Sequence, residues 1–123
     1  KKVENATDAI VKSVAEAANS LDAKLIVVPT ISGTSARLIS NLEPSCPILA
    51  LVNSEEVANR LALNYGIYAK VVNIVSDIDE LVALAIKEAK EFTNLESGDN
   101  IIVTGGLVAG KIGFTNLMKI ETL

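Results

Sequence analysis

The residues best suited to chemistry in this 123-residue sequence form a short hydroxyl- and glycine-rich segment. Its polar and glycine members are Thr30, Ser32, Gly33, Thr34 and Ser35. An apolar run at residues 25–28, typical of a strand buried on both faces, precedes it, and a helical apolar pattern follows from residue 36. The first N–H groups of a helix lack intrahelical partners and the helix dipole makes that end positive, so this unit can bind an anion. The alternative is structural: Ser32 or Thr34 caps the helix and Gly33 eases the turn.

A second glycine-rich segment, Gly105–Gly113, follows another apolar run and contains the spacing G-x-x-x-x-G-K of a nucleotide-binding P-loop. The next residue should be Ser or Thr, which holds magnesium and opens a helix, but here it is Ile112, followed by a strand-like pattern. This departure excludes a P-loop. No G-x-G-x-x-G follows any of the expected strands either, which argues against a dinucleotide site.

The remaining reactive residue types point to structure rather than catalysis. Acidic groups at 55–56, 77–80 and Glu88/Glu91 stand where helix caps and solvated faces are expected. Cys46 is the only cysteine, is expected to be an inert small residue, and cannot form an internal disulfide. Without histidine there is no zinc cluster and no Ser–His or Cys–His pair. We therefore expect no catalytic residue and no metal site in this chain.

Composition narrows the class of protein. Half of the residues are apolar and 3% are aromatic, so the core is expected to be aliphatic. The net charge of −4 argues against nucleic acid or an anionic membrane as a partner. No apolar run approaches 18 residues and no secretory leader is recognisable, which favours a soluble, cytoplasmic protein. The length suits one domain.

The elements that must position these segments alternate along the chain. Helices are expected at about 7–21, with Asn5 as its cap, and at about 34–42, 55–63 and 77–92; strands are expected at 25–28, 48–52, 67–75, 101–104 and 115–122. This order predicts a single α/β domain with helices on both faces of a largely parallel sheet. Because the connection before the last strand shows no helical pattern, that strand is expected to be antiparallel at an edge. There it either pairs with another subunit or forms an ordinary edge.

Several stretches, taken in order, resemble the C-terminal domain of pyruvate kinase. They are Ser32–Ser40, Pro44–Ile48, Asn59–Leu63, Tyr65–Tyr68 and Gly113–Ile120. The resemblance extends from about Asp8 to Ile120, so residues 1–123 are expected to form one such domain. It implies a three-layer α/β/α fold with a five-stranded mixed sheet, strand order 3-2-1-4-5 and an antiparallel last strand.

The resemblance also implies an allosteric site beyond strands one and four, where the strand order reverses. A phosphorylated effector would contact a phosphate cradle at Thr30, Ser32, Gly33, Thr34 and Ser35, and a flap at Gly106, Gly110, Lys111 and Gly113. Lys111 would meet a second anionic group. Thr34 stands where many relatives have Arg or Lys, and Val108 where many bacterial relatives have Pro. The Trp and Arg that hold a second phosphate in animal enzymes have no counterpart between Ser76 and Gly98, which favours a monophosphorylated sugar or a nucleotide such as AMP.

The catalytic machinery of pyruvate kinase, which transfers phosphate from phosphoenolpyruvate to ADP, belongs to a barrel domain of about 200 residues or more. No such barrel is present here. The resemblance therefore implies a parent enzyme that uses magnesium and potassium, and as partners of this domain its catalytic barrel and further copies contacted through the last strand. Lys1 is not preceded by methionine, which favours excision from a longer chain. The alternatives are a purely structural oligomerisation module, a stand-alone relative without ligand, and a free-standing phosphotransferase.

Overall fold

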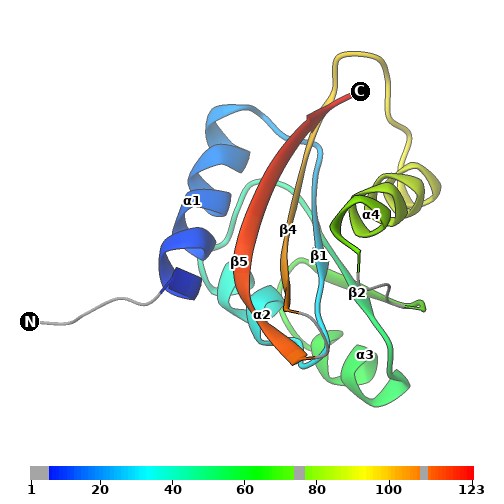
Figure 1. Cartoon of the computed structure of the whole chain (residues 1–123). Coiled ribbons are helices and arrows are strands. Elements are labelled where there is room, and N and C mark those ends of the chain that lie inside the picture. The colour runs from blue at the N-terminus through cyan, green and yellow to red at the C-terminus, as the bar shows by residue number, and fades with distance from the viewer. Residues whose placement is uncertain (1–5, 74–76, 109–110) are drawn as a thin grey trace, which may run out of the picture.

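The apolar runs of the sequence form the strands of one sheet. The computed structural model describes residues 6–73, 77–108 and 111–123. The helices are α1 (Ala6–Ser20), α2 (Thr34–Asn41), α3 (Glu55–Leu61) and α4 (Ile78–Phe92). The strands are β1 (Leu25–Pro29), β2 (Ile48–Val52), β3 (Ile67–Val71), β4 (Asn100–Val108) and β5 (Lys111–Thr122) (Figure 1). The alternation expected from the sequence is confirmed.

The sheet has the order β3-β2-β1-β4-β5, as the resemblance implied. Strand β1 is central and pairs in parallel with both neighbours, so that Val27 lies opposite Leu49 of β2 and Val103 of β4. Strand β5 runs antiparallel to β4 at one edge. The chain moves outward from β1 to β2 and β3, then returns through α4 to the other side of β1. The strand order therefore reverses between β1 and β4.

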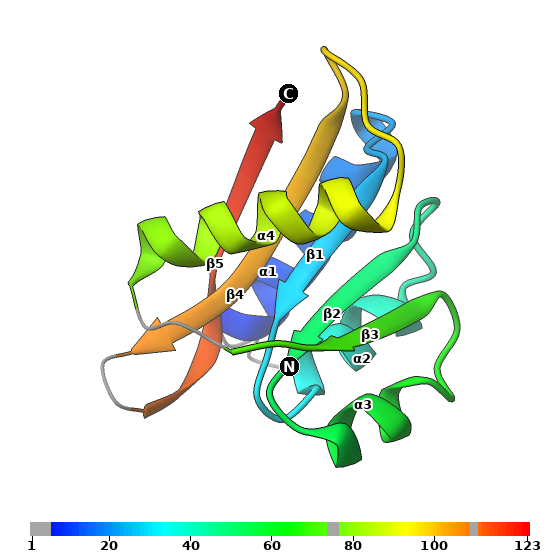
Figure 2. The same cartoon turned by 90° about the vertical axis from the view of Figure 1, so that its right-hand side faces the viewer.

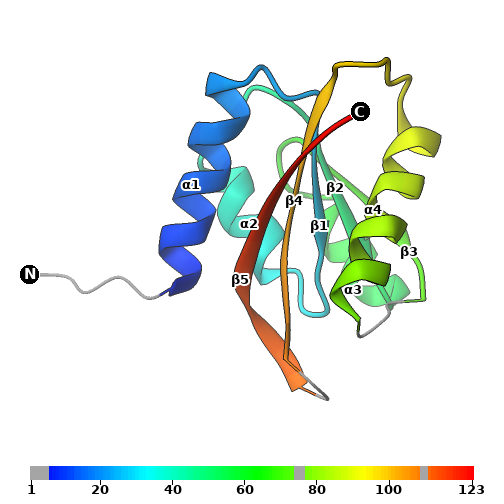
Figure 3. The same ribbon diagram turned by 45° about the horizontal axis from the view of Figure 1, so that its top comes forward.

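Alternate residues of the central strands enter two separate cores. Ile26 and Val28 of β1 belong to a core shared with α1, α2 and α3, whereas Leu25 and Val27 belong to a core shared with α4. Figure 2 shows α4 lying across one face of the sheet, with α1 and α2 on the far face. Figure 3 shows the same two helix layers, with the sheet between them, in a tilted view. This is the three-layer α/β/α fold. Because β1 is fully buried along its length, its carboxyl end is held rigidly where a site can form.

The helices α3 and α4 begin at side-chain caps. The side chain of Ser54 accepts a hydrogen bond from the N–H of Val57 at the start of α3, and that of Asp77 accepts one from Glu80 at the start of α4. The proposed cap Asn5 lies outside the described residues. The two longest helices have 15 residues each, and none in the described part of the chain is long and apolar enough to cross a membrane.

Two expected boundaries are wrong. Strand β3 ends at Val71, short of the expected range 67–75, because its partner β2 ends at Val52, which lies opposite Val71. The strands expected at 101–104 and 115–122 are longer: Leu107 pairs with Ile112 and Val108 with Lys111, so β4, which runs to Val108, and β5, which begins at Lys111, form a hairpin with a register shift near Gly105. The glycines are typical of loops, so no strand was expected here. Glycine also permits such irregularities within strands.

Candidate functional site

The candidate site lies at the carboxyl end of β1, where the strand order reverses. Residues 30–33 leave β1 toward α2, while β4 continues past the end of β1 into the hairpin. The two segments meet at Gly105, where an added Cβ would lie 2.9 Å from the carbonyl oxygen of Pro29. Only glycine fits this approach without displacing backbone. The structure thus brings together the two glycine-rich segments identified in the sequence.

The hydroxyls of the first segment bind the backbone of their own turn. The N–H of Gly33 donates to Thr30 Oγ1 at 3.1 Å, and the N–H of Thr34 donates to Ser32 Oγ at 3.3 Å. Ser32 Oγ–H in turn donates to Thr34 Oγ1 at 3.0 Å. Oxygen atoms therefore already occupy positions in front of these N–H groups. The turn is therefore satisfied internally, as the structural alternative expects.

The start of α2 differs from the simple cap considered above. Gly33 itself is the N-cap residue, with φ +87°, and makes no side-chain cap hydrogen bond. Ser32, one residue earlier, instead accepts from the N–H of Thr34, the first residue of the helix. The side chain of Leu61 packs against Gly33, and a Cβ on that glycine would lie 3.0 Å from Leu61 Cδ2. Gly33 is therefore required both by its left-handed backbone and by the contact with α3.

The predicted flap residues are distributed along the hairpin. Gly106 lies in β4, Lys111 begins β5 opposite Val108, and Gly113 lies in β5. Gly110 falls outside the described residues. The hairpin lies at the same end of the sheet as the turn after β1 (Figure 1). The backbone topology thus puts Thr30–Ser35 and the hairpin on one side of the molecule.

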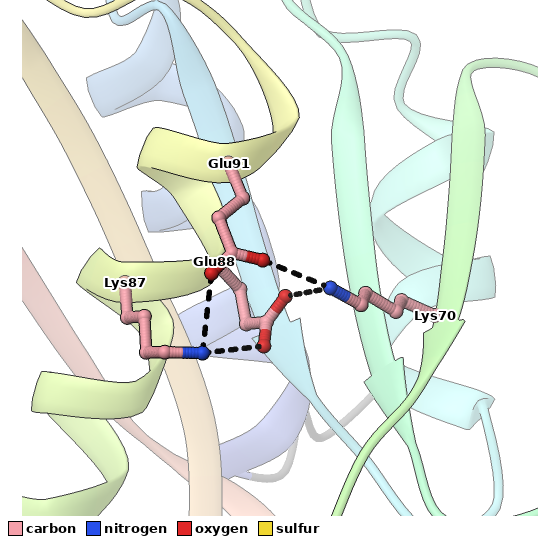
Figure 4. Close-up of polar contacts among 4 residues, drawn as sticks. All are labelled: Lys70, Lys87, Glu88 and Glu91. Carbon is pink, nitrogen blue, oxygen red and sulfur yellow. Dashed lines mark hydrogen bonds and ion pairs between the residues drawn. The ribbon is translucent and has the colours of Figure 1, made fainter.

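Two acidic residues of α4, Glu88 and Glu91, form an ion-pair cluster with Lys70 of β3, whereas Asp79 and Glu80 are exposed as expected. Lys70 Nζ lies 2.5 Å from Glu88 Oε1 and 3.2 Å from Glu91 Oε1, and Lys87 Nζ lies 3.2 Å from Glu91 Oε2 (Figure 4). Glu88 is buried, which contradicts its expected exposure, while the i,i+4 pair of Lys87 with Glu91 is exposed as expected. Two lysines balance two carboxylates, so the cluster joins α4 to the edge strand and is not suited to acid–base catalysis.

The charges of this cluster are mutually stabilised. The hydrogen bond to Glu88, and to a lesser extent the one to Glu91, raises the pKa of Lys70. The hydrogen bond from Lys87, and to a lesser extent the one from Lys70, lowers the pKa of Glu91. The contribution of Lys70 to stability is therefore complete at neutral pH and is lost only as the pH rises through its raised pKa. The contribution of Glu91 is present at neutral pH and is lost as the pH falls through its lowered pKa.

Other reactive groups are accounted for within the described residues. Burial raises the pKa of the Cys46 thiol to about 11, which agrees with an inert residue, since the thiolate is the reactive form. No group of three or more metal-ligating side chains occurs in the part of the chain that the structure describes. Sequence reasoning did not single out the basic residues Arg37 and Arg60, which line a pocket between α2 and α3 beside Ser32.

The comparisons with known proteins agree with this architecture. Residues 8–121 match the family model described as the pyruvate kinase α/β domain. The chain belongs to this pyruvate kinase family. It is 38% identical over 117 residues to pyruvate kinase from Geobacillus stearothermophilus, which covers 95% of this chain and 20% of that relative. It is 41% identical over 116 residues to pyruvate kinase from Clostridium perfringens, which covers 94% of this chain and 24% of that relative.

A solved structure supports the same assignment. The crystal structure of a pyruvate kinase from Cryptosporidium parvum matches with a TM-score of 0.84 and 35% identity, covering 99% of this chain and 23% of that one. The pyruvate kinase domain described here therefore spans only about a fifth to a quarter of these relatives. The resemblance to the C-terminal domain and its predicted strand order are both confirmed.

The ion-pair cluster yields a first prediction. Replacing Glu88 with glutamine leaves Lys70 without its closest partner, so we expect the free energy of unfolding to fall by about 2 kcal/mol; this is below the usual cost of breaking a buried pair because Lys70 is half exposed. Glu91→Gln removes the same charge from the exposed position and should have a much smaller effect. Urea unfolding of this pyruvate kinase domain at pH 7 measures both. Equal losses would show that burial of Glu88 does not matter.

The start of α2 yields a second prediction. Gly33→Ala and Gly66→Ala both place a Cβ at a left-handed backbone, with φ +87° and +73°, which costs about 1 kcal/mol. Only the Cβ at position 33 meets a neighbour, Leu61, and we expect Gly33→Ala to lose about 1 kcal/mol more. Gly66 has no atom within 4 Å of its added Cβ and is the matched control. If chemical denaturation finds the two variants equally stable, Leu61 does not constrain this turn.

Proposed function

We propose that the chain is the effector-binding regulatory domain of a pyruvate kinase and binds a phosphorylated sugar or nucleotide. The observation that supports this proposal is the reversal of strand order between β1 and β4, beyond which the turn Thr30–Ser35 begins directly after Pro29, the residue that Gly105 of β4 approaches. Ligands of open α/β sheets bind at such reversals. The hydroxyl-lined turn and the start of α2 supply donors for a phosphate, and Lys111 on the hairpin is the candidate cation for a second anionic group.

The parent enzyme would perform the chemistry elsewhere. The pyruvate kinases that this chain resembles are four to five times longer, and their remaining length can hold a catalytic barrel. We propose that such a barrel, in the same parent chain, transfers phosphate from phosphoenolpyruvate to ADP in the cytoplasm, with magnesium and potassium as cofactors. This domain contributes no catalytic residue in that proposal and acts through its contact with the barrel.

The cradle favours an effector with a single phosphate. Its polar side chains Thr30, Ser32 and Thr34 are neutral, and two of them already bind the backbone of the turn. Neutral donors suit one phosphate held by short hydrogen bonds, whereas a bisphosphate needs further cations at its second group. Ribose 5-phosphate, glucose 6-phosphate and AMP fit this requirement better than fructose 1,6-bisphosphate.

Calorimetric titration of the chain with these four compounds tests the proposal. We expect at least one monophosphate to bind with a Kd below about 1 mM, which corresponds to about 4 kcal/mol. Thr30→Val, which removes the hydroxyl that orders Gly33, should weaken that binding about tenfold. Thr93→Val, the same exchange at the far end of α4, is the control and should bind normally. Silence from all four compounds would contradict effector binding.

A second candidate role, subunit contact, is favoured by the edge strand β5. It stands last in the strand order, and in the described part of the chain no strand pairs with its outer edge. Met118 packs against the core, whereas Ile120, on the same face two residues on, is 43% exposed. Exposed apolar side chains on an edge strand suit pairing with a second copy.

Sedimentation equilibrium tests this role. We expect the chain to associate reversibly at micromolar to millimolar concentrations, and Ile120→Lys to weaken association at least tenfold, because a charge there would have to be desolvated. Leu63→Lys is the control, because this side chain is 88% exposed and stands just before β3, the strand at the opposite edge of the sheet. A monomer at the highest concentrations would remove subunit contact through β5 as a property of this chain.

A further inference from the structure

A pocket of about 530 Å³ lies between the start of α2 and the end of α3, outside the contact between β1 and β4 described above. Its walls come from residues far apart in the sequence: Ser32, Arg37, Arg60, Leu61, Leu63 and Asn64. It shares only Ser32 with the phosphate cradle. Among the residues that the structure describes, no acidic side chain lines it.

The charge of this pocket is unusual for the chain. The sequence contains two arginines, Arg37 and Arg60, and both line this one pocket from different helices. Neither makes an ion pair or side-chain hydrogen bond within the described residues, whereas Lys70, Lys87 and Lys119 all pair with carboxylates. Arginine presents a planar fork of N–H donors that matches phosphate and carboxylate oxygens in a bidentate way. Two unpaired forks at one pocket form an anion receptor.

The neighbouring backbone supports a negative ligand. The carbonyls at the end of α3 would repel an anion, but Asn64 Nδ2 donates to the carbonyl oxygens of Arg60 and Leu61, at 3.4 Å each. On the other wall, Ser32 precedes the positive end of α2. The dipole ends that border the pocket are therefore either favourable to an anion or capped.

The pocket also has an apolar wall. Leu61 is buried against Gly33 and forms the inner side, while Leu63 is 88% exposed. A bare inorganic ion would leave these side chains in water. A ligand that joins a phosphate to a sugar or a planar ring would cover them, because burial of apolar surface adds to binding.

We propose that Arg37 and Arg60 form a second anion-binding site, which takes the phosphate of a small phosphate monoester. This site is separate from the effector site proposed above at the end of β1. The two guanidinium groups hold the phosphate oxygens, and the ligand's carbon skeleton lies against Leu61 and Leu63. Since both arginines are exposed, they can be exchanged without loss of the fold.

Nuclear magnetic resonance titration tests the site directly, because two arginines give two side-chain Nε–Hε signals. With inorganic phosphate and then ribose 5-phosphate, we expect both signals to shift and to saturate with one common Kd, lower for the ester. Arg37→Lys and Arg60→Lys keep the charge but lose the fork, and each should weaken binding about tenfold. Lys90→Gln, a charge removal on the exposed side of α4, is the control and should bind within twofold of the unaltered chain.

The same spectra distinguish binding at this site from binding at the proposed effector site at the end of β1, which is called the cleft below. Shifts of both arginine signals without shifts of the Thr30 and Gly105 amides support the arginine site even if the cleft binds nothing. Shifts of those amides with unmoved arginine signals support the cleft and overturn the arginine site. Shifts that rise linearly without saturation, or equal affinities for all the arginine and lysine variants, also overturn it, since they indicate non-specific attraction.

Discussion

Strand β1 is paired on both edges and covered on both faces, and the positions of the other elements follow from this placement. Its neighbours β2 and β4 are reached by connections that leave in opposite directions, so no crossover passes over its carboxyl end. The turn after β1 and the hairpin after β4 are therefore left side by side. The close approach of Gly105 to Pro29 is the local consequence, since both strands are held in register up to Val27 and Val103. Ligands of open α/β sheets bind at such reversals, so the topology alone makes this end of the sheet the candidate site.

Much of this architecture could be predicted from hydrophobic pattern. Runs of four or five apolar residues, such as Ile48–Val52, are typical of strands buried on both faces, and the structure has that strand with the same bounds. The hairpin was missed because glycine is equally common in loops and at strand irregularities, and only pairing with β5 distinguishes them. The burial of Glu88 had a visible signal, its place on the apolar stripe of Leu81, Ala85 and Phe92. Its partner Lys70 could be identified only once the strand order put β3 beneath α4.

The candidate site was predictable in location but not in detail. Thr30 and Ser32 were identified by type, yet their oxygens bind the turn's own N–H groups, an arrangement that depends on the left-handed backbone of Gly33. A turn that is already hydrogen-bonded needs little reorganisation to accept an oxyanion, because the donors are ordered beforehand. The same bonds mean that a ligand must offer more than the hydroxyl it replaces. Charge near the turn therefore decides whether a phosphate is held, and Thr34 supplies none.

The distribution of charge shows how an acidic chain can still attract an anion. With a net charge of −4, the molecule as a whole repels phosphate, but at physiological ionic strength charges more than about 8 Å away are largely screened. The acids of α4 are also neutralised locally, since Glu88 and Glu91 are paired with Lys70 and Lys87. The two arginines lie on the other side of the sheet from α4, beside the start of α2 and with no acid at their pocket. We therefore expect local charge, rather than net charge, to decide where a negative ligand binds.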